Sequence, residues 1–397
     1  MTSIDFQVFD CDNHYYEAVD AFTRYAEPGF EGRTMQWVES AGKKRLLVGG
    51  RINRFIPNPT FDPIAKPGVM DQYFRGRNPK QENGKELFGE LEPLSKRPEY
   101  SDRDARVRLM DEQGIEGAIF LPTLGVGMEQ ALIHDPPALV SAFRAFNRWM
   151  DDDWGFAYRE RVFATPILTL VDVEAAVDQL EWALARDARF ILLVPGPVIT
   201  PSGGRSPAST EYDPLWARIN EAGVTVVLHG GDTHYTTYQK DWGEAPGMKA
   251  FQTGTFVPLL SSDPTQDTLA SMLTNHLFAR FPNVRVACVE TGSEWVLHLF
   301  AKLKKSFGQT PFAYPEDPRD TFRRHVSISP YYEEDLAALR EAIGVDRMLM
   351  GSDFPHVEGL AEPVSYVDDL TAAGFDRDEC FRIMRTNGVG LSQRHPL

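Results

Sequence analysis

The chain has 397 residues, of which 42% are hydrophobic and 25% are charged, so it can bury one large core or two ordinary ones. Its formal net charge of −16 argues against a nucleic-acid-binding surface, because such a surface needs clustered Lys and Arg. The sequence shows neither a secretion signal nor an apolar run of about 20 residues that could span a bilayer, so we expect a cytoplasmic protein that binds neither nucleic acid nor membranes.

Short β-branched runs alternate with amphipathic helical stretches along the chain, a pattern typical of βα units around a parallel sheet. The helical stretch 101–114 begins at Ser101, the expected cap, and ends at Gly114. A second stretch, 172–185, repeats apolar residues at helical spacing. The predicted strands, in chain order, are residues 6–10, 116–123, 162–168, 189–196, 224–231, 284–292, 325–330 and 347–355.

These eight strands favour a (β/α)8 barrel of the TIM type over an open doubly wound sheet, since no glycine-rich phosphate loop follows the first strand. We therefore predict one barrel domain over residues 1–397. A barrel takes roughly 250 residues, and we assign the surplus to an insertion at residues 30–100, with a hairpin signal at 34–52. Because the insertion follows the first strand, we expect it to lie as a lid over the C-terminal mouth of the barrel.

The insertion contains, among other aromatic residues, Trp37, Phe55, Phe61, Tyr73 and Phe74. They suit an apolar pocket for a small aromatic or fatty substrate. A homodimer contact is the alternative, because aromatic spacing does not distinguish a pocket from an interface.

Polar side chains follow four of the apolar strands. The first strand leads to Asp12 and His14, and later strands end at His229, Glu290 and Asp353. A carboxylate or imidazole there is costly unless it is paired or bound to a metal, and the C-terminal strand ends form the catalytic face of a barrel. We therefore expect these residues to meet at one site.

The pair at the end of the first strand has the spacing of two metal ligands. Asp12 and His14 are two positions apart, so on an extended backbone their side chains leave the same face, and Asp10 shares that parity. A set of two imidazoles and two carboxylates suits Zn²⁺, with Mn²⁺ or Fe²⁺ as alternatives.

The order of these motifs resembles a known family. Asp12-x-His14, His229, "RFPNVRVACVETGSEW" and "GSDFPH" are similar to the amidohydrolase-related group (amidohydrolase 2), which includes aminocarboxymuconate-semialdehyde decarboxylase and the hydroxybenzoate-type decarboxylases. The resemblance covers nearly the whole chain. It implies a distorted (β/α)8 barrel with one divalent metal ion, held by Asp12, His14, His229 and Asp353, and Asp353 as the catalytic base.

The chain departs from the family pattern at two positions. Asp12 stands where the superfamily commonly has the first histidine of His-x-His, although some family decarboxylases also carry a carboxylate there. Glu290 stands where many relatives have a histidine that contacts substrate or moves a proton, so that step cannot be carried over unchanged. The predicted strand 189–196 ends without the lysine of binuclear relatives, which favours a single ion.

Each site residue has an alternative interpretation. Glu290 could be a catalytic proton shuttle with a raised pKa, an extra metal ligand or a structural acid bound to an arginine. Asp10, Glu17 and His356 are expected to support the ligands, but Glu17 could instead cap a helix, and His356, like Glu358, could orient Asp353 or stabilise its loop.

Metal-assisted hydrolysis is our first functional hypothesis. In it, a metal-activated water attacks an amide, ester or lactone, Asp353 acts as base and Glu290 assists the proton transfer. The alternative is non-oxidative decarboxylation of an aromatic or unsaturated carboxylate. A barrel that binds a ligand without turnover is the third hypothesis.

Overall fold

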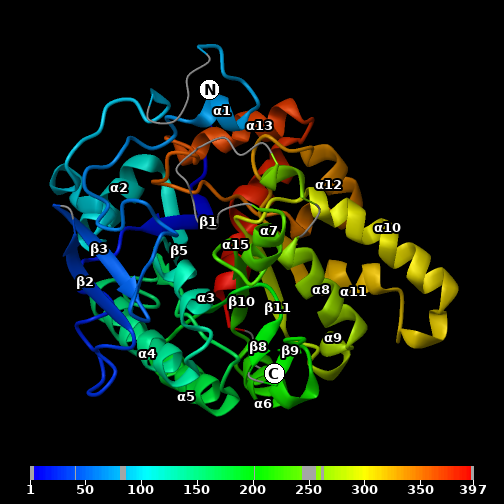
Figure 1. Ribbon diagram of the computed structural model, residues 1–397. Coiled ribbons are helices and arrows are strands. Elements are labelled where there is room, and N and C mark those ends of the chain that lie inside the picture. The colour runs from blue at the N-terminus through cyan, green and yellow to red at the C-terminus, as the bar shows by residue number, and fades with distance from the viewer. Residues whose placement is uncertain are drawn as a thin grey trace.

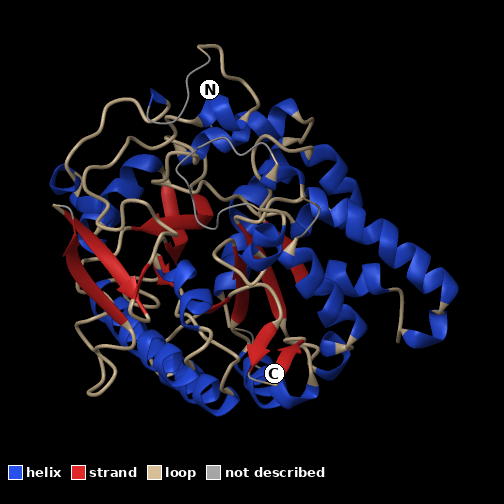
Figure 2. Cartoon of the chain, in the orientation of Figure 1, coloured by secondary structure: helices blue, strands red, loops and turns tan. Residues whose placement is uncertain are grey.

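The computed structural model describes residues 4–40, 42–80, 86–200, 202–243, 256–260 and 263–394. Strands lie in the middle of the molecule and most helices lie around them, as Figures 1 and 2 show. None of the helices in these ranges is long and apolar enough to cross a bilayer. The insertion predicted at 30–100 includes residues 41 and 81–85, which are outside the described residues.

Two parallel sheets form the centre of the α/β fold. One has the order β1-β5-β6 and the other the order β7-β10-β11-β12, and every neighbouring pair is parallel. Their strands are β1 (Val8–Tyr15), β5 (Ile115–Pro122), β6 (Val162–Ala164), β7 (Phe190–Leu193), β10 (Thr225–His229), β11 (Arg285–Val289) and β12 (Val326–Ile328). Seven of the eight predicted strands are therefore present.

The eighth predicted strand differs from the prediction. Residues 347–355 form only isolated parallel bridges, from Met348 to Ile328 and from Phe354 to Asn13. The Ser352 N–H donates to the Asp10 carboxylate (3.0 Å) rather than to a backbone carbonyl, so the regular ladder is interrupted there. A third bridge joins Ile167, beyond β6, to Leu192 of β7, and these bridges link the edges of the two sheets.

The central strands are buried along almost their whole length. All eight residues of β1 and all five of β10 are buried. Strands covered on both faces are typical of parallel sheets, because the connecting helices pack on them. The large side chains of Trp149, Trp154 and Trp216 are fully buried among these layers.

Side-chain caps define where several helices begin. The helix α2 (Arg103–Gln113) is capped by Asp102, whose carboxylate accepts from the Ala105 N–H (2.7 Å), and it ends at the left-handed Gly114. The predicted cap Ser101 is therefore wrong by one residue, because the carboxylate of Asp102 occupies the capping position. Asp172 caps α5 (Val173–Leu184) in the same way.

The remaining helices complete the layer around the sheets. They are α1 (Asp71–Phe74), α3 (Met128–Leu132), α4 (Pro136–Asp153), α6 (Asp213–Ala222), α7 (Thr236–Asp241), α8 (Pro264–Thr274), α9 (Leu277–Arg280), α10 (Glu294–Gln309), α11 (Pro318–His325), α12 (Leu336–Ile343), α13 (Tyr366–Ala372), α14 (Arg377–Phe381) and α15 (Asn387–Ser392). A π-helical turn, Arg382–Thr386, joins the last two.

The inserted segment contains the hairpin that the sequence predicts. Strands β2 (Met35–Ser40), β3 (Lys43–Val48) and β4 (Arg51–Ile52) form an antiparallel sheet at the side of the molecule (Figure 2). The described residues that follow are mostly loops, with α1 and one isolated bridge between Ile64 and Glu92. A second hairpin, β8 (Val198–Thr200) with β9 (Gly203–Arg205), follows β7.

Candidate metal centre

Asp12 and His14 meet at the end of β1, although the backbone between them is not a regular strand. The register of β1 against β5 shifts between Asp10 and Asn13, which marks a bulge. His14 Nε2 nevertheless lies 3.2 Å from Asp12 Oδ1, and the two side chains are 1% and 6% exposed. The predicted pair is therefore brought together on one side of the strand.

His229, the last residue of β10, lies beside this pair. Its Nε2 is 3.4 Å from His14 Nε2 and 3.9 Å from Asp12 Oδ1. Its Nδ1–H donates to the Gly230 carbonyl (2.6 Å), which leaves Nε2 as the atom with a lone pair. Ligating histidines commonly have their other ring nitrogen fixed in this way.

Glu290 follows β11 and points into the same group. Its Oε2 lies 2.8 Å from His229 Nε2 and 3.4 Å from His14 Nε2. Its backbone has φ +50°, an uncommon left-handed conformation that turns the side chain away from the strand direction. A Cβ at Gly230 would come within 2.5 Å of the Glu290 carbonyl oxygen, so a glycine is required beside it.

The contacts of Glu290 distinguish among its predicted roles. Burial raises the pKa of this carboxyl, but the imidazoles of His229 and His14 outweigh burial and hold the pKa well below its usual range. These contacts do not produce the raised pKa that a proton shuttle needs. Among the described residues, its ion pairs are with imidazoles and not with an arginine, which favours the interpretation as a metal ligand.

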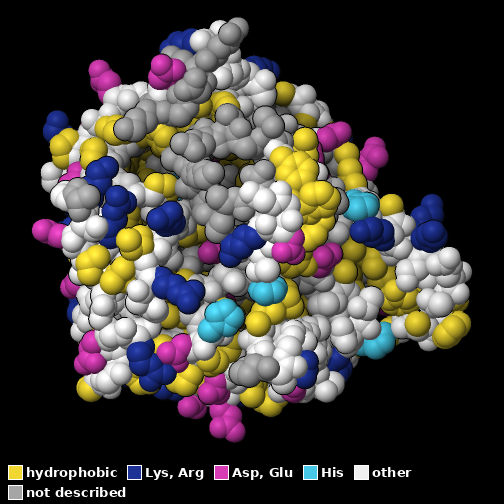
Figure 3. Space-filling model, viewed as in Figure 1, with side chains coloured by type: hydrophobic (Ala, Val, Ile, Leu, Met, Phe, Trp, Pro, Cys, Tyr) yellow, Lys and Arg dark blue, Asp and Glu magenta, His cyan; other side chains and the backbone are white. Residues whose placement is uncertain are grey.

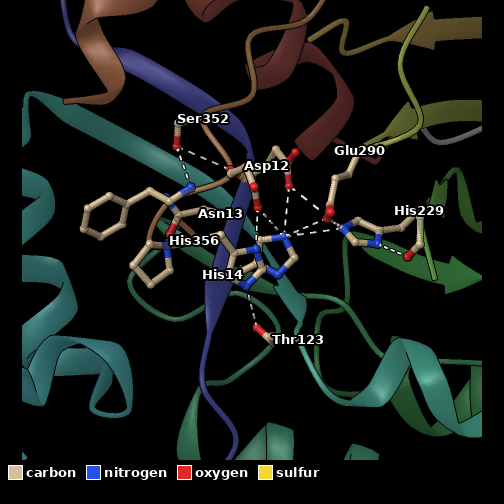
Figure 4. A network of polar contacts seen from close by, with 12 residues as sticks. Asp12, Asn13, His14, Thr123, His229, Glu290, Ser352 and His356 are labelled. Atoms are coloured by element: carbon tan, nitrogen blue, oxygen red, sulfur yellow. Dashed lines mark hydrogen bonds and ion pairs between the residues drawn. The ribbon is translucent and has the colours of Figure 1, made fainter. Parts of the chain in front are cut away.

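The donor atoms of Asp12, His14, His229 and Glu290 fit a single ion. All four lie within 4.8 Å of one another, and Figure 4 shows them directed toward a common point. Five of the six separations between these donor atoms are 2.8 to 3.9 Å, which brackets the roughly 3.4 Å edge of a tetrahedron with metal–ligand bonds of about 2.1 Å. Burial lowers the pKa of His14, but hydrogen bonds to Asp12 and Glu290 raise it to about 10, which shows that the site attracts positive charge.

Asp353 lies at the edge of this group. Its N–H donates to the Asp12 carbonyl (2.8 Å), and its φ of +54° is left-handed. Its Oδ1 is 3.4 Å from His14 Nε2 but only 2.6 Å from His356 Nδ1. Burial and the neighbouring Glu290 carboxylate raise its pKa well above the usual value. Asp353 can therefore hold a proton beside the ion site.

His356 connects Asp353 to Thr123 at the end of β5. The Thr123 hydroxyl donates to the Tyr15 carbonyl (2.9 Å), so its oxygen is placed to accept from His356 Nε2 at 3.0 Å. Burial and the neighbouring His14 hold the pKa of His356 well below its usual value, so the ring is neutral. A ring protonated at Nε2 accepts at Nδ1, so His356 can accept a hydrogen bond from Asp353 whenever Asp353 carries a proton. The His356 ring also lies against His14, with centroids 4.1 Å apart (Figure 4).

Asp10 supports the site from beneath. It is fully buried, and its carboxylate accepts from the Asp12 N–H (3.1 Å), the Asn13 side chain (2.9 Å) and both the N–H and the hydroxyl of Ser352. Burial raises the pKa of this carboxyl to about 6. Asp10 thus ties the end of β1 to the segment that carries Asp353.

Glu17 lies further from the donor atoms than its neighbours in the sequence. Its Oε1 accepts from the N–H groups of Leu124 (2.8 Å) and Gly125 (3.0 Å), where a 3₁₀ turn (Gly125–Gly127) begins after β5. These bonds fix the start of the turn that follows β5. Burial raises the pKa of this carboxyl to about 7.

The sequence reasoning missed three residues around the site. Arg106 of α2 is fully buried and donates to Asn13 Oδ1 and to the Glu99 carbonyl. Ser352 and Thr123 complete the hydrogen bonds described above. Arg106 could have been found as an arginine on the apolar side of a predicted helix. For Ser352 and Thr123 the only signal was a polar residue at the end of a strand.

A cavity of about 710 Å³ opens over the candidate ligands. His14, His229, Glu290 and His356 are at its floor, and almost half of its lining residues come from segment 30–100. Phe55 and Phe61 are among them, whereas Trp37, Tyr73 and Phe74 are not. On the face seen in Figure 3, Lys and Arg side chains are dispersed among acidic ones.

Comparisons with known proteins agree with this arrangement. A family model described as "Amidohydrolase" matches residues 9–388. The crystal structure of an amidohydrolase from Mycobacterium avium subsp. paratuberculosis K-10 is 42% identical, with a TM-score of 0.92 over 98% of this chain and 100% of that chain.

Two more distant structures share the fold. A dihydroxybenzoic acid decarboxylase from Polaromonas sp. JS666, with bound manganese and the inhibitor 2-nitroresorcinol, is 18% identical, with a TM-score of 0.58 over 83% of this chain and 96% of that one. A 2,6-dihydroxybenzoate decarboxylase from Rhizobium is 19% identical, with a TM-score of 0.55 over 73% and 88% of the two chains.

Proposed function

This chain belongs to the amidohydrolase family, and we propose that within it the protein is a metal-dependent hydrolase of an amide, ester or lactone. The observation that carries the proposal is the convergence of Asp12, His14, His229 and Glu290 below an open cavity, with Asp353 beside them. Hydrolysis by a metal-activated water needs a polarising cation and a group that moves one proton, and these residues can hold the first and supply the second.

One divalent ion is proposed at this site, with Asp12, His14, His229 and Glu290 as its ligands. When bound, the ion would polarise the carbonyl and acidify water. Two imidazoles with carboxylates favour Zn²⁺, and Mn²⁺ or Fe²⁺ are the alternatives because the oxygen ligands are hard. The Polaromonas structure contains manganese. The family pattern makes Asp353 the fourth ligand, but here its Oδ1 is bonded to His356.

Asp353 is proposed as the catalytic base. Its position 3.4 Å from His14 Nε2 places it beside the ion, and its raised pKa lets it take a proton from water and return that proton to the leaving group. His356 positions Asp353 through its 2.6 Å hydrogen bond, and Thr123 fixes the His356 ring. The low pKa of Glu290 supports a role as ligand over one as proton carrier.

We also infer that the two parallel sheets close into a distorted barrel. The bridges of Ile167 with Leu192, Met348 with Ile328 and Phe354 with Asn13 would join all eight segments into a ring. The proposed lid is segment 30–100, because Phe55 and Phe61 line the cavity over the site.

The direct test replaces Asp353 by asparagine and measures metal content and turnover together. We expect one divalent ion per chain in both proteins, and turnover reduced by about 10² to 10⁴-fold in Asp353→Asn. Normal turnover in the variant would contradict the role of Asp353. Wild-type protein without a stoichiometric ion would instead favour the third hypothesis, a barrel that binds a ligand without turnover.

Decarboxylation is the second candidate, favoured by the similarity of fold to the two decarboxylases described above. An aromatic carboxylate would then be the substrate. Trapping of released CO₂ from hydroxybenzoates, run against a panel of amides, esters and lactones, separates the two reactions. CO₂ release without hydrolysis would replace our first proposal by this one.

A further inference from the structure

We infer that the acyl group of the substrate is uncharged and apolar, and that anionic substrates are discriminated against. This inference rests on the proposed hydrolysis and adds the substrate class to it. It comes from the cavity wall and from the charge of the site beneath it.

The part of the cavity lining that comes from segment 30–100 is mostly apolar. Phe61 and Ile64 are buried, and the Phe61 ring stacks on Tyr16 with centroids 4.5 Å apart. Phe55 packs so closely on Gly127 that a Cβ at position 127 would overlap its ring. Leu91, which is 53% exposed, also lines the cavity and marks its solvent-accessible side. This wall suits a hydrocarbon group that continues from the carbonyl.

The charges in the cavity are acidic. Among its described lining residues the acids are Glu290 and Glu358, and no Lys or Arg is present. The buried Arg106 is bonded to Asn13 and to the Glu99 carbonyl, and it does not line the cavity. A substrate carboxylate would therefore find no cationic side chain on the described wall.

A bound divalent ion does not make the net charge of the cavity positive. The carboxylates of Asp12 and Glu290 offset the two positive charges of a divalent ion, so the loaded ligand group presents no net positive charge to a substrate carboxylate. Glu358 adds a further acid on the wall. A second anion a few Å away, in surroundings of low effective dielectric, costs enough to lower binding by at least about tenfold.

A series of 4-nitrophenyl esters tests this on protein loaded with one equivalent of Zn²⁺. The acetate, butyrate and hexanoate lengthen the apolar chain, and the adipate monoester has the hexanoate length with a terminal carboxylate. We expect kcat/KM to rise at least about tenfold from acetate to hexanoate, and to fall at least about tenfold from hexanoate to adipate. Equal or faster hydrolysis of the adipate ester, or no dependence on chain length, would overturn the inference.

A binding measurement distinguishes failure of the proposed hydrolysis from failure of the inference about the substrate class. If no ester, amide or lactone is turned over, calorimetry compares hexan-1-ol with 6-hydroxyhexanoate on the same Zn²⁺-loaded protein. Binding of the alcohol at least about tenfold more tightly would support the inference while the hydrolysis proposal fails. Equal binding, or tighter binding of the anion, would overturn both.

A charge placed on the wall gives the matched variant. Leu91→Lys adds a cation at an exposed lining position, and Leu91→Gln adds polarity without charge. We expect the hexanoate-to-adipate ratio of kcat/KM to fall several-fold in Leu91→Lys and to change by less than about twofold in Leu91→Gln. The same ratio in both variants would contradict an electrostatic origin of the selectivity.

Discussion

The strand ends and the inserted segment 30–100 lie on opposite sides of the same cavity, yet they are built in different ways. The strand-end side chains of Asp12, His14 and His229 are almost fully buried and have polar partners within 4 Å. The described part of the insertion contributes mainly apolar side chains from loops and no ligand of the candidate site. In the proposed function, the first region performs the chemistry and the second selects the substrate.

This difference has a physical cause. Buried acids and imidazoles are costly unless each has a partner, so they must be held by a rigid scaffold such as Asp10 and its bonds to Ser352 and Asn13. An apolar wall needs only shape, which loops can supply and vary. Changes at the strand ends should therefore abolish turnover, while changes in the insertion should alter substrate preference.

The largest effect is expected from His14→Ala. His14 Nε2 is within 3.4 Å of donor atoms on Asp12, His229 and Glu290, so its loss removes the centre of the ligand group. We expect loss of the bound ion and a decrease in kcat/KM of about a thousandfold or more, measured by elemental analysis and steady-state kinetics. His298→Ala, at an exposed position on α10, is the control and should keep both. Retention of the ion by His14→Ala would remove His14 from the ligand set.

The next largest effect is expected from Glu17, which connects the two regions. Its carboxylate holds the turn Gly125–Gly127, and Phe55 of the insertion packs on Gly127. Burial raises the pKa of Glu17 from 4.5 to about 7. The folded state therefore binds the proton more tightly than the unfolded state, so this group lowers stability as the pH rises from about 4.5 to about 7. The loss amounts to at most about 3 kcal/mol.

Glu17→Gln should remove that pH dependence. Urea unfolding of the metal-free proteins at several pH values between 4 and 8 would show the difference in unfolding free energy between variant and wild type increasing with pH. Glu129→Gln is a useful second variant, because burial also raises the pKa of Glu129 to about 7 but Glu129 is bonded to Thr169. A constant difference for Glu17→Gln across this range would show that folding does not raise the pKa of its carboxyl.

The sequence predicted the strand-end residues of the cavity better than the residues of the insertion. Apolar runs followed by polar residues were enough to place Asp12, His14, His229, Glu290 and Asp353 at strand ends. The sequence left the role of Glu290 open, because that role depends on how closely its carboxylate approaches His14 and His229, which lie on other strands. The same holds for Ser352, whose bond to Asp10 interrupts the eighth predicted strand. In the insertion, Trp37 was grouped with the cavity residues, but its indole N–H donates to the Val19 carbonyl (2.6 Å).

A smaller effect is expected from His356, the positioning residue of the proposed base. His356→Ala removes the bond to Asp353 and the link to Thr123 but leaves the described ligand group intact. We expect kcat to fall about 10 to 100-fold with the ion retained and KM little changed. The pH–rate profile should shift as well, because Asp353 loses its neighbour. An unchanged profile with reduced kcat would indicate a structural role only.

The smallest effect is expected on the other side of the cavity, at Phe55. Truncation by Phe55→Ala removes part of the apolar wall, so KM for the hexanoate ester should rise several-fold while kcat changes by less than about twofold. Gly127→Ala should act in the same direction, because its Cβ would displace the Phe55 ring. In the double variant that ring is absent, so its KM should be no higher than that of Phe55→Ala alone. Trp37→Phe, in the same insertion but outside the cavity lining, is the matched control. An equal rise of KM in Trp37→Phe, or additive effects of the first two variants, would mean that the insertion acts through its overall stability and not through the contact between Phe55 and Gly127.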